Sequence, residues 1–200
     1  MQPVYNNLCM DLVTVLGRTI PFALASGVNL YATVAVLGLV SRYGWVQLPE
    51  GFRGFEHPAV IILALAMYGL EFVADKIPWV DSVWDAVHTV IRPLGGAAVA
   101  VTALGDSTPA MQAAVALLAG SVAMTTHLSK AGTRAVANAS PEPFSNWILS
   151  LLEDAFAVTF SWVALQHPYL ALLASVLILT VIVMSASVLF RAVRNRLRRA

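Results

Sequence analysis

The sequence has few of the residues that a water-soluble protein carries on its surface. Lys, Arg, Asp and Glu make up 12% of the 200 residues, whereas 58% are hydrophobic. A typical soluble domain carries about 25% charged residues, so about half of the usual complement is missing. Together with a mean hydropathy of +0.75, this shortage excludes an ordinary soluble domain and indicates that lipid is the solvent.

Cysteine and the short motifs of soluble enzymes are also scarce. Cys9 is the only cysteine, so an internal disulfide is excluded and a cysteine-based metal site is implausible. The sequence has no phosphate-binding glycine loop, zinc-binding His-Glu-x-x-His helix or nucleophile elbow. The N-terminus lacks the basic segment of a cleavable signal peptide. A net charge of +1 does not support nucleic-acid binding, and we predict no bound metal or cofactor.

Apolar stretches predict an all-α, polytopic bundle of about six transmembrane helices, since about 20 apolar residues cross ~30 Å of hydrocarbon. Prolines and turn residues divide the chain into segments of suitable length. Residues 8–18 would form an interfacial lead-in helix or a separate re-entrant segment. Asp81 or Ser82 would cap the third span. The predicted spans, in a single membrane domain, are 19–42, 58–76, 82–104, 110–137, 146–165 and 169–190.

The first predicted span contains residues that weaken a helix. Pro21 and the Ser26-Gly27-Val28-Asn29 step lie inside it, so we expect a kink or local unwinding there. Asn29 and Tyr31 are candidates for binding at a broken helix of the transporter type. An interhelical hydrogen bond is the more common use of such residues.

Positive charges set the expected orientation, because cytoplasmic loops carry an excess of Lys and Arg. Residues 191–200 form a basic tail that contains Arg191, Arg194, Arg196, Arg198 and Arg199. We place this tail in the cytoplasm, where it would bind anionic lipid head groups. Alternating back through six spans puts the N-terminus in the cytoplasm too.

Ionisable residues inside the predicted spans form stripes, because residues three or four apart share one helix face. Each charge at membrane depth costs at least ~2.5 kcal/mol on insertion scales, so such residues indicate a functional site. The candidate site residues lie toward the cytoplasmic ends of their helices and are Glu71, Asp75, Asp81, Asp85, His88, Arg92, His127, Lys130, Arg134, Asn138, Glu153 and Asp154. Asn146 and Ser150 belong to the same stripe as Asp154.

The stripes belong to two helical hairpins, which we expect to pair their opposite charges and line a cavity open to the cytoplasm. The alternative is purely structural. Residues near helix ends can extend to the interface, and acids near helix N-termini complement the helix dipole. Asp81, Asp85 and His88 have the chemistry of divalent-cation ligands, but their spacing is weakly specific and Lys76 nearby argues against a dedicated cage.

Several of these residues form a pattern that extends from about Ala23 to the last helix. It consists of Gly27-x-Asn29-x-Tyr31, Glu71-x-x-x-Asp75-Lys76-x-Pro78-x-x-Asp81-Ser82-x-x-Asp85, Arg92-Pro93, His127-x-x-Lys130-Ala131-x-x-Arg134-x-x-x-Asn138-x-Ser140 and Glu153-Asp154. The combination resembles an uncharacterised bacterial multi-pass membrane family, domain of unknown function 4126. The resemblance implies a location in the bacterial inner membrane and no particular activity.

The leading functional hypothesis is a small transporter or channel for a charged or protonatable solute. Histidine suits proton exchange because its pKa is near 6.5. The solute would be bound, or protons relayed, by Asp85, His88 and His127. An anionic group would be held, or the charge balance set, by the basic residues Arg92, Lys130 and Arg134.

Two other classes of function remain open. In a membrane-embedded enzyme acting on a lipid phosphate or isoprenoid, Asp75, Asp81 and Asp85 would hold Mg²⁺, while Lys130 and Arg134 would clamp the phosphate. In a structural or assembly subunit, the stripes would only join helices. We also expect a homo-oligomer that uses the small residues around Gly95-Gly96 or Gly120.

Overall fold

The computed structural model describes residues 3–48, 50–139 and 144–197, and its regular structure is entirely helical. The all-α prediction is confirmed. Arg198 and Arg199 of the basic tail lie outside the described residues. The elements are α1 (Pro3–Val28), α2 (Leu30–Tyr43), the 3-10 helix η1 (Glu50–Glu56), α3 (Pro58–Ala74), α4 (Pro78–Leu104), α5 (Pro109–Asn138), α6 (Phe144–Gln166) and α7 (Pro168–Leu197).

Proline marks the first residue of α3, α4, α5 and α7. A proline suits this position because its φ is already helical and its missing N–H would have no partner there. The start of α4 at Pro78 corrects the expected start at residue 82, so Asp81 lies in the first turn and does not cap the helix. Pro93 lies inside α4, which continues through it.

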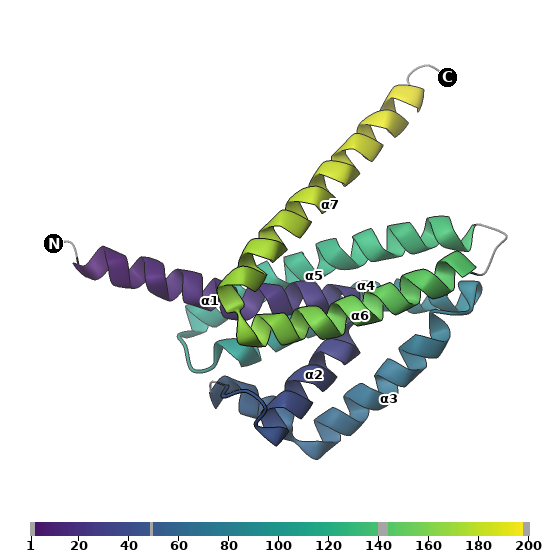
Figure 1. Ribbon diagram of the computed structural model, residues 1–200. Coiled ribbons are helices and arrows are strands. Elements are labelled where there is room, and N and C mark those ends of the chain that lie inside the picture. The colour runs from purple at the N-terminus through teal and green to yellow at the C-terminus, as the bar shows by residue number, and fades with distance from the viewer. Residues whose placement is uncertain (1–2, 49, 140–143, 198–200) are drawn as a thin grey trace.

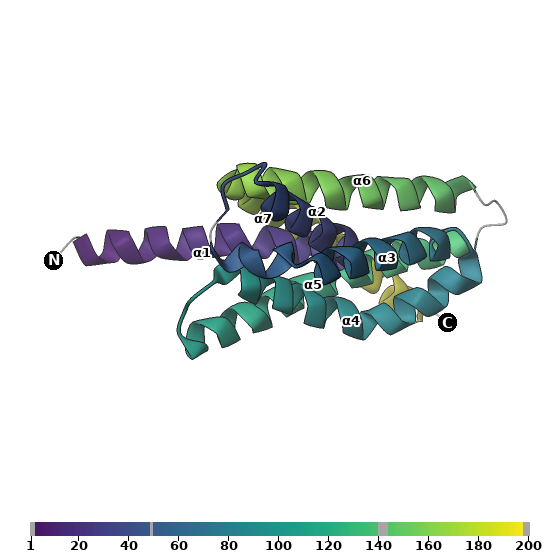
Figure 2. The ribbon, with the colours of Figure 1, turned by 90° about the horizontal axis from the view of Figure 1, so that it is seen from below.

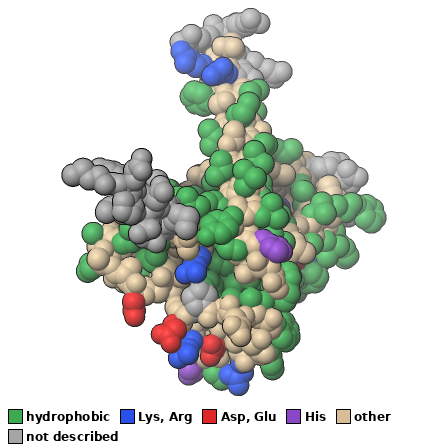
Figure 3. All heavy atoms as spheres, turned by 60° about the vertical axis from the view of Figure 1, so that its left-hand side comes forward, with side chains coloured by type: hydrophobic (Ala, Val, Ile, Leu, Met, Phe, Trp, Pro, Cys, Tyr) green, Lys and Arg blue, Asp and Glu red, His purple; other side chains and the backbone are tan. Residues whose placement is uncertain are grey.

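Helix α1 lies at the centre of the bundle and packs against α4, α5, α6 and α7 (Figures 1 and 2). Its side chains Phe22, Leu24 and Ala25 are at most 1% exposed. Helix α7 diverges from the others at a steep angle (Figure 1). The exposed part of α7 is largely apolar, as the green side chains along the projecting helix in Figure 3 show.

The chain reverses its direction inside the bundle at Asn29. This residue has an extended backbone (φ −147°, ψ 102°), and its side-chain oxygen caps α2 by accepting a hydrogen bond of 2.9 Å from the N–H of Ala32. Helix α2 then runs back toward the end at which α1 enters the bundle (Figures 1 and 2). Accordingly, the Phe52 ring of η1 lies 5.7 Å from the Phe22 ring of α1, centroid to centroid.

This reversal corrects the expectation of one helix over 19–42. The unwinding that was expected near Asn29 is present, but it separates α1 from the shorter helix α2, which runs back toward the end at which α1 enters the bundle. The segment 8–18, expected as a lead-in helix, is continuous with the rest of α1.

Four of the described helices are long and apolar enough to cross a membrane: α4, α5, α6 and residues Pro168–Arg191 of α7. Together, η1 and α3 make a fifth if the 66° bend between them is counted as a break within one span. The apolar part of α1 (Leu12–Val28) and helix α2 are shorter. These apolar helices indicate a membrane protein, although the expected six spans are not reached.

The glycines that we expected at a dimer face lie in contacts within the chain. A Cβ added at Gly96 would lie 2.6 Å from the Cβ of Ala123, and one at Gly120 would lie 3.3 Å from the carbonyl oxygen of Pro93. Gly95 faces Leu30 in the same way. These small residues let α4 approach its neighbours closely, and a dimer face around them stays a prediction.

Candidate functional site

A cluster of buried charges joins α3, α4, α5 and α6. We call it the charge cluster, and its nine ionisable members are Glu71, Asp75, Asp81, Asp85, Arg92, Lys130, Arg134, Glu153 and Asp154. All of these except Glu153 are at most 6% exposed, and the Glu153 side chain is 14% exposed. The two hairpins therefore bring their charged faces together inside the bundle, as the spacing of the stripes led us to expect.

Lys130 of α5 connects carboxylates from two other helices. Its ammonium nitrogen lies 3.2 Å from Glu71 Oε1, 3.6 Å from Asp75 Oδ2 and 3.3 Å from Glu153 Oε2. It also donates a hydrogen bond of 3.1 Å to the carbonyl oxygen of Val28. These contacts use the full donor capacity of the ammonium group.

Arg134 lies one helical turn further along α5 and binds acids from α6 and from the end of α3. It donates to Asp75 Oδ2 at 2.7 Å and to Glu153 Oε2 at 2.5 Å. Its other terminal nitrogen donates to the carbonyl oxygen of Asp75 and the side-chain oxygen of Asn146. Asp81 lies 3.5 Å away and accepts a hydrogen bond of 2.6 Å from Asn138.

Arg92 of α4 joins the cluster to the broken helix formed by α1 and α2. It donates to Glu71 Oε1, and it donates to the carbonyl oxygen of Gly27 at 3.1 Å. It also contacts His127 Nδ1 at 3.1 Å. Because an arginine only donates, His127 Nδ1 accepts, and His127 Nε2 then donates to the carbonyl oxygen of Asp85 at 3.1 Å. These contacts fix a neutral His127.

The break at Asn29 presents two helix ends of opposite polarity to the cluster. The last carbonyls of α1 carry partial negative charge and bind Arg92 and Lys130. The side-chain amide nitrogen of Asn29, the residue that caps α2, donates to Asp154 Oδ1 at 2.9 Å. The broken helix thus contacts cations at one end and a carboxylate at the other.

Tyr31 and His88 form a smaller group beside the break. The carbonyl oxygen of Trp84 lies 2.8 Å from His88 Nδ1, so this nitrogen carries a proton. The Tyr31 hydroxyl lies 3.0 Å from His88 Nε2 and donates to it. The Trp84 ring stacks on the His88 ring at 4.6 Å between centroids. In the part of the chain that the structure describes, His88 has no hydrogen bond or ion pair with a member of the charge cluster.

Acidic groups outnumber basic groups in the charge cluster. The cluster contains six carboxyl groups and three cations, Arg92, Lys130 and Arg134, and four of the carboxyl groups form ion pairs with these cations. Within the described residues, Asp85 and Asp154 form no ion pair. Asp154 interacts with the side chains of Asn29 and Tyr68, whereas Oδ1 of Asp85 is buried without a hydrogen-bond partner. Lys76 is half-buried nearby and donates to Phe72 and Ser150 rather than to a carboxylate.

The arrangement does not favour a metal centre. In the parts of the chain that the structure describes, no three His, Cys, Asp or Glu side chains are grouped so that they could hold a metal ion. Asp81 is bound by Asn138, and His88 by Tyr31 and Trp84. The suggested ligand sets, Asp81 with Asp85 and His88 or Asp75 with Asp81 and Asp85, therefore do not converge.

Sequence reasoning did not include several contacts among the site residues. Asn146 follows the spacing of its stripe but was not selected, although it binds Arg134 and the carbonyl oxygen of Asp75. Thr89 contacts His127 Nε2 at 3.1 Å, and its position four residues after Asp85 is the signal that could have found it. The backbone carbonyls of Gly27 and Val28 carry no such signal, because their role depends on the break that exposes them.

Comparison with known proteins identifies a family but no activity. The chain has no match among curated proteins or solved structures. One family model matches residues 16–187, which include the whole charge cluster. The chain therefore belongs to the family described as a domain of unknown function (DUF4126).

Proposed function

We propose that the protein is a small membrane transporter or channel for a charged or protonatable solute, and that the charge cluster forms its pathway. The observation that carries this proposal is the surplus of three buried carboxyl groups over cations in the cluster. An ionised carboxylate without a partner is costly in a low-dielectric interior. The surplus groups are therefore neutralised by bound protons or by a cation.

Asp85 and Asp154 are the best carriers of such a proton or cation, since neither forms an ion pair with a described residue. Asp154 also binds Asn29 at the helix break. Broken helices with charged partners at their ends are typical of transporter binding sites. The location of an unpaired acid at this break supports a transport role.

A purely structural role explains the paired groups but not the surplus. Polar contacts between membrane helices contribute only ~0.6 kcal/mol on average. Two unpaired buried carboxyl groups would weaken such an assembly. The enzyme alternative finds less support, because Lys130 and Arg134 are already bound by carboxylates and are not free to clamp a phosphate.

Proton flux into proteoliposomes tests the proposed function. With a potassium diffusion potential as the driving force and a trapped pH dye as the readout, we expect Asp85→Asn and Asp154→Asn each to lower flux at least ten-fold. Asp106→Asn, in the exposed turn before α5, is the matched control and should leave flux unchanged. Equal flux in wild type and both cluster variants would refute the pathway and leave the structural role.

We also propose that the termini lie on opposite sides of the membrane, which revises the expected cytoplasmic N-terminus. If α1 and α2 enter and leave on one side, five spans follow, counting η1 with α3. Lys76 and the arginine tail then share one side, which the positive-inside rule assigns to the cytoplasm. Gly17 lies against Pro168 at the opposite end, so Arg18 faces the outside.

Thiol labelling tests this orientation in a Cys9→Ser chain. A membrane-impermeant maleimide should label Arg18→Cys in intact cells, whereas Lys76→Cys should react only after permeabilisation. If Arg18→Cys were labelled only in permeabilised cells, the proposed orientation would be wrong and the N-terminus would be assigned to the cytoplasm. Fractionation of a bacterial host would test the inner-membrane location that the family resemblance implies.

A further inference from the structure

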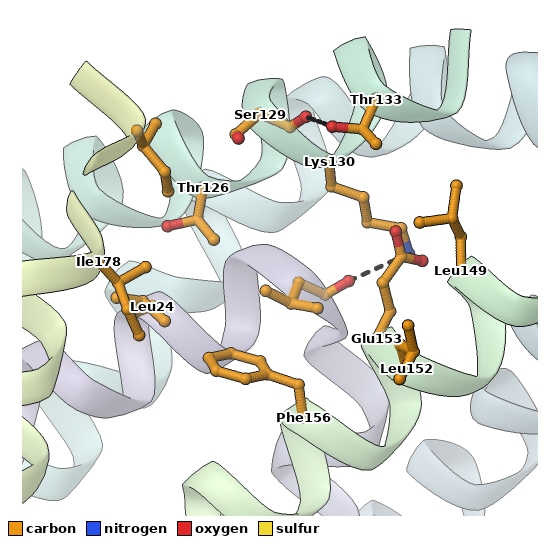
Figure 4. A pocket seen from close by; sticks show the side chains of 12 residues that line it. Leu24, Thr126, Ser129, Lys130, Thr133, Leu149, Leu152, Glu153, Phe156 and Ile178 are labelled. Carbon is orange, nitrogen blue, oxygen red and sulfur yellow. Dashed lines mark hydrogen bonds and ion pairs between the residues drawn. The ribbon is translucent and has the colours of Figure 1, made fainter. Parts of the chain in front are cut away.

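An open pocket of about 380 Å³ lies between α5, α6 and α7, next to the charge cluster (Figure 4). Its walls are mainly apolar and include Leu24, Leu149, Leu152, Phe156, Ile178 and Ile182. Its polar floor is formed by Lys130 and Glu153, whose charged ends point toward one another in Figure 4. The volume falls within the range of about 300–1,000 Å³ that is typical of small-molecule sites.

Glu153 is the charged group that a ligand in this pocket can reach. Its side chain is 14% exposed, whereas that of Lys130 is 3% exposed. Glu153 Oε1 accepts only from Arg134 Nε, at 3.3 Å, so it keeps acceptor capacity. Lys130 has no donor to spare, because its ammonium group is already shared among three carboxylates and the Val28 carbonyl.

The charge behind the pocket favours a cation. Glu153 is itself paired with Lys130 and Arg134, but the cluster as a whole has three more acids than bases, so a positive group beside it lowers the electrostatic energy. A phosphate or carboxylate at the same place would meet the surplus negative charge. The Phe156 ring, which lines the pocket, would further favour a cation near its face.

The shape and walls of the pocket favour a hydrophobic body on that cation. Helix α7 leans away from α5 and α6 (Figure 1). The pocket is open on one side, and this side would face lipid if the helices that line it span the membrane. An apolar molecule dissolved in the bilayer could enter from this side without crossing water. Its charged group would then reach Glu153.

We propose that this pocket binds a hydrophobic organic cation, that is, a protonated or quaternary ammonium or a phosphonium group on an aromatic or aliphatic body. The inference rests on the proposed transport function and names the class of its solute. A cation beside Glu153 would add positive charge next to the cluster, and this would favour release of protons from the surplus carboxyl groups. Binding of the cation and flux of protons are separately measurable.

Equilibrium dialysis of the purified protein in detergent tests the proposal, with tetraphenylphosphonium as the probe. Tetraphenylborate has nearly the same shape and the opposite charge, so it controls for apolar partitioning. Ser129→Trp fills the pocket wall without removing a charge, and Ser121→Trp, exposed on the same helix and outside the pocket lining, is its matched control. Glu153→Gln removes the charge that a ligand can reach.

We expect saturable binding of tetraphenylphosphonium that weakens at least ten-fold in Ser129→Trp and Glu153→Gln and is unchanged in Ser121→Trp. Equal binding of tetraphenylborate, equal binding in wild type and Ser129→Trp, or no saturable binding would each overturn the proposal. If Glu153→Gln fails to fold, the comparison of Ser129→Trp with Ser121→Trp still shows whether the probe binds in the pocket. Absent binding together with Asp85-dependent proton flux would refute the solute class and leave the pathway standing.

Discussion

Replacement of Arg134 with methionine is expected to destabilise the protein by about 3–5 kcal/mol, the cost of breaking a buried ion pair by removing one partner. The side chain is 1% exposed and donates to both Asp75 and Glu153. Methionine replaces the aliphatic part of the arginine side chain but leaves these carboxylates in an apolar interior, with Lys130 as the cation that still pairs with them among the described residues. The free energy of unfolding, measured by titration with a denaturing detergent, should show this loss.

The matched control is Arg53→Met. Arg53 also pairs with a glutamate, Glu50, but their side chains are 72% and 87% exposed, and exposed pairs contribute little because water screens them. This variant should unfold like the wild type. Adding Glu153→Leu to Arg134→Met should restore part of the loss, since it removes one of the stranded charges. Similar unfolding of Arg134→Met and Arg53→Met would contradict the assignment of the buried pairs.

The spacing of ionisable residues was sufficient to predict where the charges gather. Lys130 and Arg134 are four residues apart, so both project from one face of α5, and burial of that face brings them against the acids of α3 and α6. Apolar surroundings force opposite charges to pair, because the alternative is an uncompensated charge in a low dielectric. The existence of the cluster therefore follows from helical periodicity and the solvent.

The sequence did not predict which acids remain unpaired or the path of the chain at Asn29. Lys130 contacts three carboxylates while Asp85 contacts no cation among the described residues, and such choices depend on differences of a few ångströms between helices. Hydropathy over residues 19–42 indicates that the segment lies in an apolar medium, but it does not indicate whether the chain crosses the membrane or turns back within it. A segment that crosses and one that returns have the same apolar composition.

Small residues were ambiguous for a related reason. Glycine on an apolar helix permits close contact with any neighbour, so sequence alone does not distinguish a contact within the chain from one between copies. Gly96 and Gly120 lie against other helices of the same chain, so contacts within the chain account for at least part of their role. Oligomerisation, and a face around these glycines, stay predictions.

Gly27→Ala is expected to destabilise the protein by about 1–3 kcal/mol, the usual cost of overpacking, with the upper end favoured here. A Cβ at this position would lie 2.5 Å from the carbonyl oxygen of Ala123 and 2.8 Å from the Cβ of Thr126. A backbone oxygen cannot rotate away as a flexible side chain can, so α1 must move away from α5. That shift would withdraw the Gly27 carbonyl from Arg92, which it meets at 3.1 Å.

Gly69→Ala and Gly132→Ala are matched controls, because an added Cβ meets nothing within 4 Å at either helical position. Alanine favours a helix by about 1 kcal/mol over glycine, so these variants should be neutral or slightly stabilised. The free energy of unfolding in a denaturing detergent and the proteoliposome flux should both fall in Gly27→Ala alone. If Gly27→Ala unfolded like the controls, the close contact of α1 with α5 would be wrong. The ends of the broken helix would then have no fixed position against Arg92 and Lys130, and the site would lose the geometry on which its proposed function depends.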